Sequence, residues 1–316
     1  TYVSGNEFDT SSAEIVSYDK TTDRLYVVNA QDKSVDVLTF DAQGKPTKDS
    51  TINLQSAATN AGITIGAANS VVAKNGLVAV AIEHSTKQDN GIIALYKSSD
   101  LSLINTFAAG ALPDMGTMTD DGHYIIAANE GEPSKDYKVD PEGSVTVIDT
   151  MTWKARNATF TKYNDKSIKD VRVFGPGASF AQDMEPEYIT VSKDSKTAWV
   201  GLQENNALAI VDLAKAEVTD VVALGFKDHS KAENAIDASN KDGKINIATY
   251  PVKGMYMPDA ITSVTANGKT YILTANEGDS RDYDGFSEEV RVADLKLDAK
   301  AFPNAEELQD KKVLGR

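Results

Sequence analysis

The chain has 316 residues, 41% hydrophobic and 25% charged, enough for one large β domain or two medium ones. The 32 Lys and Arg residues stand against 47 Asp and Glu residues, so the net charge is −15. This charge excludes nucleic acid as a partner and favours cations. The absence of Cys excludes disulfides and thiolate metal sites, and no apolar run of about 18 residues predicts a transmembrane segment.

The chain is organised in five similar units. Each opens with a small residue or Pro followed by an acid or amide and a β-rich run, as in AEIVS (13–17), ANSVV (68–72), PDMGTM (113–118), PEYITV (186–191) and PDAITS (258–263). A turn rich in Asp, Asn, Lys and Gly follows, and then a second apolar run: RLYVVNA, LVAVAIE, HYIIAANE, TAWVGLQE and TYILTANE. These pairs predict hairpins. A third strand is expected in each unit, at SVDVLTF (34–40), GIIALY (91–96), GSVTVID (143–149), ALAIVDL (207–213) and EEVRVADL (288–295).

The units recur at spacings of 45 to 73 residues, counted between Glu14, Asn69, Asp114, Glu187 and Asp259. Three or four antiparallel strands repeated in this way predict an all-β fold of the β-propeller type, with about five blades visible. The alternative is a β-sandwich in which the hairpin similarity is a coincidence. We expect residues 1–316 to form a single propeller domain or the N-terminal part of one.

Blade geometry brings two sets of positions to one face. The starts of the first strands offer Glu14, Asn69, Asp114, Glu187 and Asp259, and the ends of the second strands offer Asn29, Glu83, Asn129, Glu130, Gln203, Glu204, Asn276 and Glu277. Carboxylates crowded in a partly desolvated mouth raise one another's pKa unless a cation compensates them. With three His and no thiols, the available ligands are hard oxygens that suit Ca²⁺ first, with Mg²⁺ and Mn²⁺ as alternatives.

Two acidic loops repeat one another, AANEGEPSKDYKVDPEG (127–143) and TANEGDSRDYDGF (274–286). The predicted metal ligands come mainly from these loops, with three residues supporting them from the channel mouth: Glu130, Glu132, Asp136, Glu277, Asp279 and Asp282, and then Glu14, Glu187 and Asp259. The alternative is that both loops are solvated acidic surface. A third stretch, DASNKDGKIN (237–246), lacks the bidentate Glu of a calcium-binding EF-hand loop and is interpreted as a polar turn.

Longer strings carry a family resemblance. FGPGASFAQDMEPEYITVSKDSKTAWVGLQENNALAIVDL (174–213), LGFKDHS (224–230), GMYMPDAI (254–261) and TANEGDSRDYDGF resemble the mesenchyme-specific cell-surface glycoprotein family, whose bacterial relatives are the choice-of-anchor family I proteins. The resemblance covers nearly the whole chain. It implies export or surface attachment, about seven blades and an association with calcium, and some bacterial members carry an alkaline phosphatase label. Relatives continue beyond the segment that ends here at Arg316, so the resemblance implies that the chain is incomplete at its C-terminus.

Two functional hypotheses follow. The first is an extracellular or cell-surface protein, with a periplasmic location as the alternative, that binds calcium through an acidic face and acts as a scaffold or binding protein. Its expected partners are divalent cations, mineral, a surface polymer or a missing C-terminal segment. The second is a metal-dependent extracellular phosphoesterase, in which Arg281 clamps phosphate unless it simply pairs with Asp279 and Asp282. No phosphate-binding glycine loop or nucleophile elbow is present, so whether the protein is an enzyme stays open.

Overall fold

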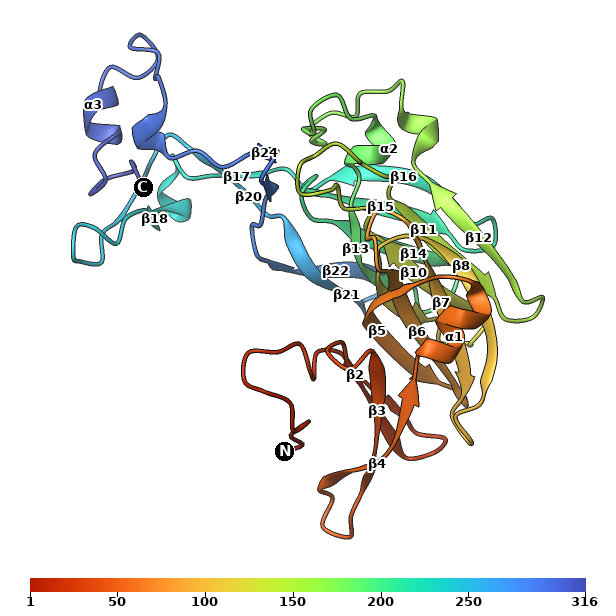
Figure 1. Ribbon diagram of the computed structural model, residues 1–316. Coiled ribbons are helices and arrows are strands. Elements are labelled where there is room, and N and C mark those ends of the chain that lie inside the picture. Colours follow the sequence, from red (N-terminus) through yellow and green to blue (C-terminus); the bar gives the residue numbers. More distant parts are fainter.

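The computed structural model describes residues 1–316 and consists mainly of four consecutive antiparallel sheets (Figure 1). Each sheet has four strands in sequence order. The blades are β1 (Val16–Asp19), β2 (Arg24–Asn29), β3 (Ser34–Phe40) and β4 (Pro46–Asn53); β5 (Ile65–Lys74), β6 (Leu77–His84), β7 (Asn90–Lys97) and β8 (Leu103–Ala111); β9 (Pro113–Met118), β10 (Tyr124–Asn129), β11 (Ser144–Asp149) and β12 (Lys154–Thr159); β13 (Pro186–Val191), β14 (Thr197–Leu202), β15 (Ala207–Asp212) and β16 (Glu217–Ala223).

Local turn chemistry explains the repeated hairpins. In the second blade Asn75 and Gly76 link Lys74 to Leu77 and both have positive φ, 53° and 80°. The fifth unit uses the same device, with Asn267 and Gly268 at φ 52° and 71°. A two-residue loop with both φ values positive is the type I′ turn, whose twist matches that of paired strands, and Asn-Gly is its preferred sequence.

The blades are arranged around their first strands. The strand β5 contacts β1 and β9, and β9 in turn contacts β13, so the innermost strands of successive blades are neighbours. Apolar side chains fill the spaces between the blades: one core cluster joins the third and fourth blades, a second joins the first and second, and a third joins the second and third. This arrangement confirms the all-β propeller and excludes the two-sheet sandwich.

Few residues are helical. The helices are α1 (Gln55–Ala61), α2 (Phe180–Asp183) and α3 (Ala305–Leu308), with short 3₁₀ turns η1 (Thr161–Tyr163), η2 (Ala232–Asn234) and η3 (Val292–Asp294). None of the helices combines the length and apolar character needed to cross a bilayer.

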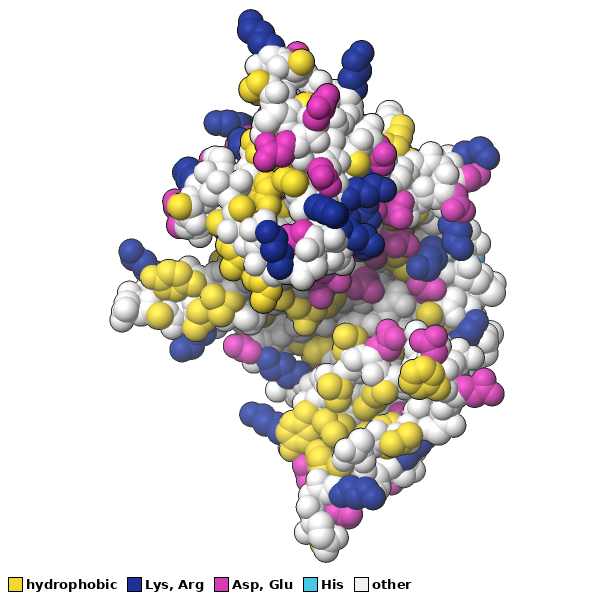
Figure 2. All heavy atoms as spheres, turned by 90° about the vertical axis from the view of Figure 1, so that its left-hand side faces the viewer, with side chains coloured by type: hydrophobic (Ala, Val, Ile, Leu, Met, Phe, Trp, Pro, Cys, Tyr) yellow, Lys and Arg dark blue, Asp and Glu magenta, His cyan; other side chains and the backbone are white.

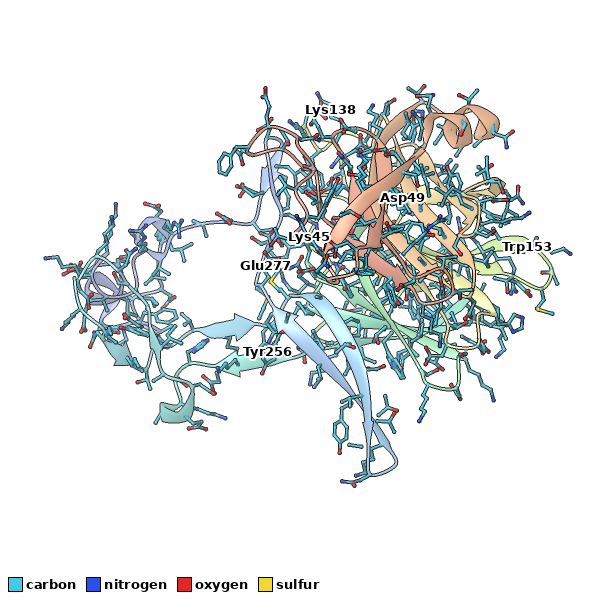
Figure 3. All side chains as sticks on the ribbon, turned by 90° about the horizontal axis from the view of Figure 1, so that it is seen from below. Lys45, Asp49, Lys138, Trp153, Tyr256 and Glu277 are labelled. Atoms are coloured by element: carbon cyan, nitrogen blue, oxygen red, sulfur yellow. The ribbon has the colours of Figure 1, made fainter.

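The fifth unit departs from the other four. Its first two strands, β21 (Pro258–Ala266) and β22 (Lys269–Asn276), pair only with each other. The expected third strand at 288–295 is wrong, because this segment runs as coil and η3. Figure 3 shows the β21–β22 hairpin projecting away from the blades, with Glu277 at its base.

A small lobe lies to one side of the blades and is joined to them by extended segments (Figure 1). Two segments distant in sequence build it, one between the fourth and fifth units and one at the C-terminal end. The minor strands of the first segment are β17 (Phe226–Asp228), β18 (Ile236–Asp237), β19 (Ile247–Ala248) and β20 (Lys253–Met255). A short hairpin of β23 (Asp282–Tyr283) and β24 (Phe286–Ser287) precedes the C-terminal segment. Tyr250, Leu308 and Leu314 form the centre of the lobe's apolar core.

Candidate functional site

An acidic recess lies where the loops after the second strands meet the starts of the first strands. Its volume is about 300 Å³, and one of its eleven lining residues is hydrophobic. The lining residues are Glu130, Glu132, Glu187, Gln203, Glu204, Glu277, Asp279, Ser280, Arg281, Asp282 and Tyr283. Figure 2 shows Asp and Glu side chains gathered in a hollow between two parts of the surface. We call this set the acidic recess.

Direct contacts hold the two acidic loops together. The backbone N–H of Gly285 donates to the carbonyl oxygen of Lys135 at 2.9 Å. The ring of Tyr137 packs edge-on against the rings of Tyr283 and Phe286, with centroids 5.6 and 5.2 Å apart. A Cβ atom at position 285 would lie 2.3 Å from a backbone oxygen, so only glycine permits this approach. The second loop is therefore fixed against the first.

Three carboxyl groups of the acidic recess, those of Glu130, Glu187 and Glu204, have raised pKa values. Burial, followed by the nearby carboxylates of Glu204 and Asp259, raises the pKa of Glu187 to about 9. Burial and Glu132 raise that of Glu130 well above its usual range. Burial also raises the pKa of Glu204 to about 7. Without a compensating cation, these groups therefore hold protons near neutral pH.

Two buried carboxylates, those of Asp183 and Glu185, lie beside the recess and are partly neutralised by Arg281. The guanidinium Nε of Arg281 donates to Glu185 Oε1 at 3.0 Å, and its Nη2 donates to the backbone oxygen of Asp183 at 2.7 Å. The Asp183 carboxylate lies 3.7 Å from Nη2. All three side chains are almost fully buried. Asp279 and Asp282 are not the partners of Arg281, so the ion pair expected from sequence proximity is wrong.

Lys87 supplies the other cation near the recess. Its ammonium group lies 3.3 Å from Glu132 Oε2. Burial acts to lower the pKa of Lys87, but the carboxylates of Glu132 and Glu83 outweigh it and raise the pKa overall. Lys87 also lines a neighbouring recess that shares Glu132, Asp282 and Tyr283 with the acidic one. Part of the negative charge is therefore offset from the rim.

The structure brings together six of the nine predicted ligands. Glu130, Glu132, Glu187, Glu277, Asp279 and Asp282 line the acidic recess. Asp259 is half-buried beside it and acts on the pKa values of Glu187 and Asp114.

Two predicted ligands lie apart. Asp136 is exposed and pairs with Lys138 at 2.6 Å, and this bond lowers the pKa of Asp136 to about 2. Glu14 is exposed just before β1 and does not line the recess. Both corrections have the same physical reason: an acid in the repeated pattern reaches the recess only if its loop or strand end turns inward.

Sequence reasoning missed part of the site. Glu185 and Asp183 were not predicted, because they precede the fourth blade's first strand, in and just after α2, and belong to no repeated pattern. Asp114 and Glu204 were among the inward-facing positions but not among the predicted metal ligands. The pKa of Asp114 is raised to about 6 by burial and by Glu132.

The donor set of the recess fits a hard cation. Its acidic side chains offer carboxylate oxygens, the donors that hard cations prefer. Two carboxylate oxygens, Glu187 Oε2 in the recess and Glu185 Oε2 beside it, are buried without a hydrogen-bond partner. However, the structure contains no group of three or more His, Asp or Glu side chains that is already arranged to hold a metal ion. A bound ion would require the carboxylates to move closer together.

The fold and this site define a β-propeller whose acidic loops meet at one recess. A family model described as the choice-of-anchor I domain matches residues 14–316, and the chain belongs to this family. Membership of this family fits a bacterial surface-anchored or secreted protein. A search of the curated proteins finds no match to the chain. The comparisons give no support to the mesenchyme-specific glycoprotein side of the resemblance.

Solved structures with a similar arrangement include a nidogen/laminin complex, at 10% identity and TM-score 0.47 over 85% of this chain and 74% of that chain. The Dos1 propeller matches at 16% identity and TM-score 0.45, over 66% of this chain and 47% of that chain. A Lactobacillus plantarum protein matches at 15% identity and TM-score 0.45, over 76% and 71%. Since these scores are low, the propeller assignment depends on the blades described above.

Proposed function

We propose that this protein is a surface β-propeller that binds calcium at the acidic recess and serves as a scaffold or binding protein there. The observation that carries the proposal is the concentration of carboxylates in one recess, where burial raises the pKa of Glu187 to about 9. A divalent cation would replace several protons at once and relieve the mutual repulsion of the carboxylates.

The residues that would hold the ion are the inward-facing carboxylates of the two repeated loops, Glu130, Glu132 and Glu277, with Glu187 from the start of β13. Gln203 donates from its Nε2 to Glu277 Oε2 at 3.1 Å, which steadies Glu277 at the base of its hairpin. When bound, calcium would supply positive charge that joins loops from the third and fifth units, and would thereby add to folding stability.

The test is a melting curve in chelator and then with added Ca²⁺, for the native chain and for the double variant Glu130→Gln/Glu277→Gln. At a free concentration about 100 times Kd, calcium should stabilise the native chain by roughly 2.7 kcal/mol. The double variant should lose most of this gain, because it removes two of the carboxylates that would bind the ion.

Asp136→Asn is the matched control. It removes a carboxylate from the same loop, but one that is exposed and paired with Lys138. It should keep the full response to calcium. Identical melting of the native chain with and without calcium, together with no bound metal by elemental analysis, would reduce both loops to solvated acidic surface.

No observation favours the phosphoesterase alternative. Arg281, the side chain suited to a phosphate clamp, is buried against Glu185 and Asp183. We therefore expect no hydrolysis of a generic phosphomonoester, with or without Ca²⁺. Calcium-dependent hydrolysis lost in Glu130→Gln/Glu277→Gln would instead establish an enzyme.

A further inference from the structure

The edge of β22 is a strand-pairing surface that the structure leaves open. In each of the four complete blades the second strand pairs on both sides, whereas β22 pairs only with β21. The hairpin also exposes apolar side chains, with Val264, Tyr271 and Leu273 at 44, 48 and 54% exposure. An open edge with such side chains is a template for a further strand.

The third blade shows what such a strand looks like. Its β10 segment HYIIAANEG (123–131) is matched in the fifth unit by TYILTANEG (270–278), with six of nine residues identical. Its third strand contains VTVID (145–149), and VRVAD (290–294) repeats this with three of five identical. Fourteen residues, 130–143, separate β10 from β11, and twelve, 277–288, separate β22 from Glu289.

We propose that the edge of β22 binds residues 289–294 of this same chain as a third strand, in exchange with their place in the small lobe. In the third blade Asn129 pairs with Ser144 and Ala128 with Val145. The same register places Asn276 opposite Glu289 and Ala275 opposite Val290. Six residues then alternate as they do in β11, with Val290 and Val292 on the face of Leu273.

The exchange gives up a small set of contacts in the lobe. Val292 leaves its packing against the apolar core, and the backbone hydrogen bonds of η3 open. The N–H of Ala293 also leaves Gly315 O, at 3.2 Å, and Gln309 Nε2 leaves the carbonyl oxygens of Val292 and Ala293, at 3.4 and 3.5 Å. Val290 is 58% exposed and makes no apolar core there. Glu288, which bonds Arg172, lies before the segment and stays in place. In return, the open edge of β22 gains backbone partners, which an exposed edge otherwise takes from water or another chain.

A designed disulfide tests the register, because the chain has no Cys of its own. Ala275 and Val290 are both exposed, so Ala275→Cys/Val290→Cys should not disturb folding. Directly opposed residues have Cα atoms about 4.5–5.5 Å apart, within disulfide range. Under mild oxidation we expect a cross-link within the monomer in most molecules. Val264→Cys/Tyr271→Cys, a pair already opposed in the hairpin, is the positive control.

Three outcomes would overturn the proposal. If only the control pair cross-links, residues 289–294 do not reach β22. A cross-linked dimer on non-reducing gels would assign the edge to a second copy. Equal cross-linking of Ala275→Cys/Val292→Cys, which is displaced by two residues along the segment, would show contact without a fixed register. The test does not involve calcium, so its result is independent of the proposed function.

Discussion

At the scale of single residues, burial decides which charges matter. Arg281 and Glu185 form a pair that is almost fully buried, and Arg281 is held in addition by the backbone oxygen of Asp183. Lys138 and Asp136 form an exposed pair of comparable geometry. Breaking one partner of a buried pair leaves an uncompensated charge, whereas an exposed pair contributes little.

We therefore expect Arg281→Met to destabilise the protein by about 3–5 kcal/mol. Lys138→Met should leave the free energy of unfolding almost unchanged, because solvent screens this exposed pair. Urea unfolding followed by fluorescence measures both. Similar losses in the two variants would mean that Arg281 does not hold its loop against α2.

The raised pKa values predict an unusual pH dependence. Glu187 titrates near 4.5 in the unfolded chain and near 9 in the folded one, so between these values the folded chain binds more protons. Stability should then fall as pH rises through this window. In chelator, the melting temperature should decrease from pH 5 to pH 8.5, and Glu187→Gln should flatten the decrease. A melting temperature that rises over this range would contradict the pKa assignment.

At the scale of elements, sequence patterns predicted the blades but only part of the site. The Asn-Gly turns and the repeated acid-led strands were sufficient for the hairpins, since both are local signals. The third strand of the fifth unit is wrong because residues 292–294 form η3, where Val292 packs against the lobe's apolar core. Glu185 was missed because its partner, Arg281, is 96 positions away, and no local pattern records that contact.

The contact between the third and fourth blades also depends on a glycine, Gly143, that the repeated sequence pattern does not single out. A Cβ atom at Gly143 would lie 1.9 Å from Met184 O and 2.6 Å from Pro186 Cδ, where the fourth blade begins. Gly116, in the first strand of the third blade, has no neighbour closer than 3.8 Å.

Gly143→Ala should therefore cost about 1–3 kcal/mol through overpacking. Gly116→Ala should cost much less, because the added methyl group meets only ordinary contacts. Thermal melting of the two variants in parallel compares them. Equal stability would mean that the third and fourth blades separate easily at this joint.

At the scale of the whole molecule, stability is divided unequally between the blades and the small lobe. The two largest core clusters contain 22 and 18 buried residues, whereas the lobe's cluster contains three, so the lobe has far less apolar burial to resist opening.

Native-state hydrogen exchange should show the amides of β10 and β14 exchanging slowly, near the rate set by global unfolding. Amides of residues 236–250 and 305–315 should exchange faster and at a common rate, because the two segments share one core. Tyr250→Ala should accelerate both segments and leave the blades unchanged. Acceleration of the blades to the same extent would show instead that lobe and propeller unfold as one cooperative unit.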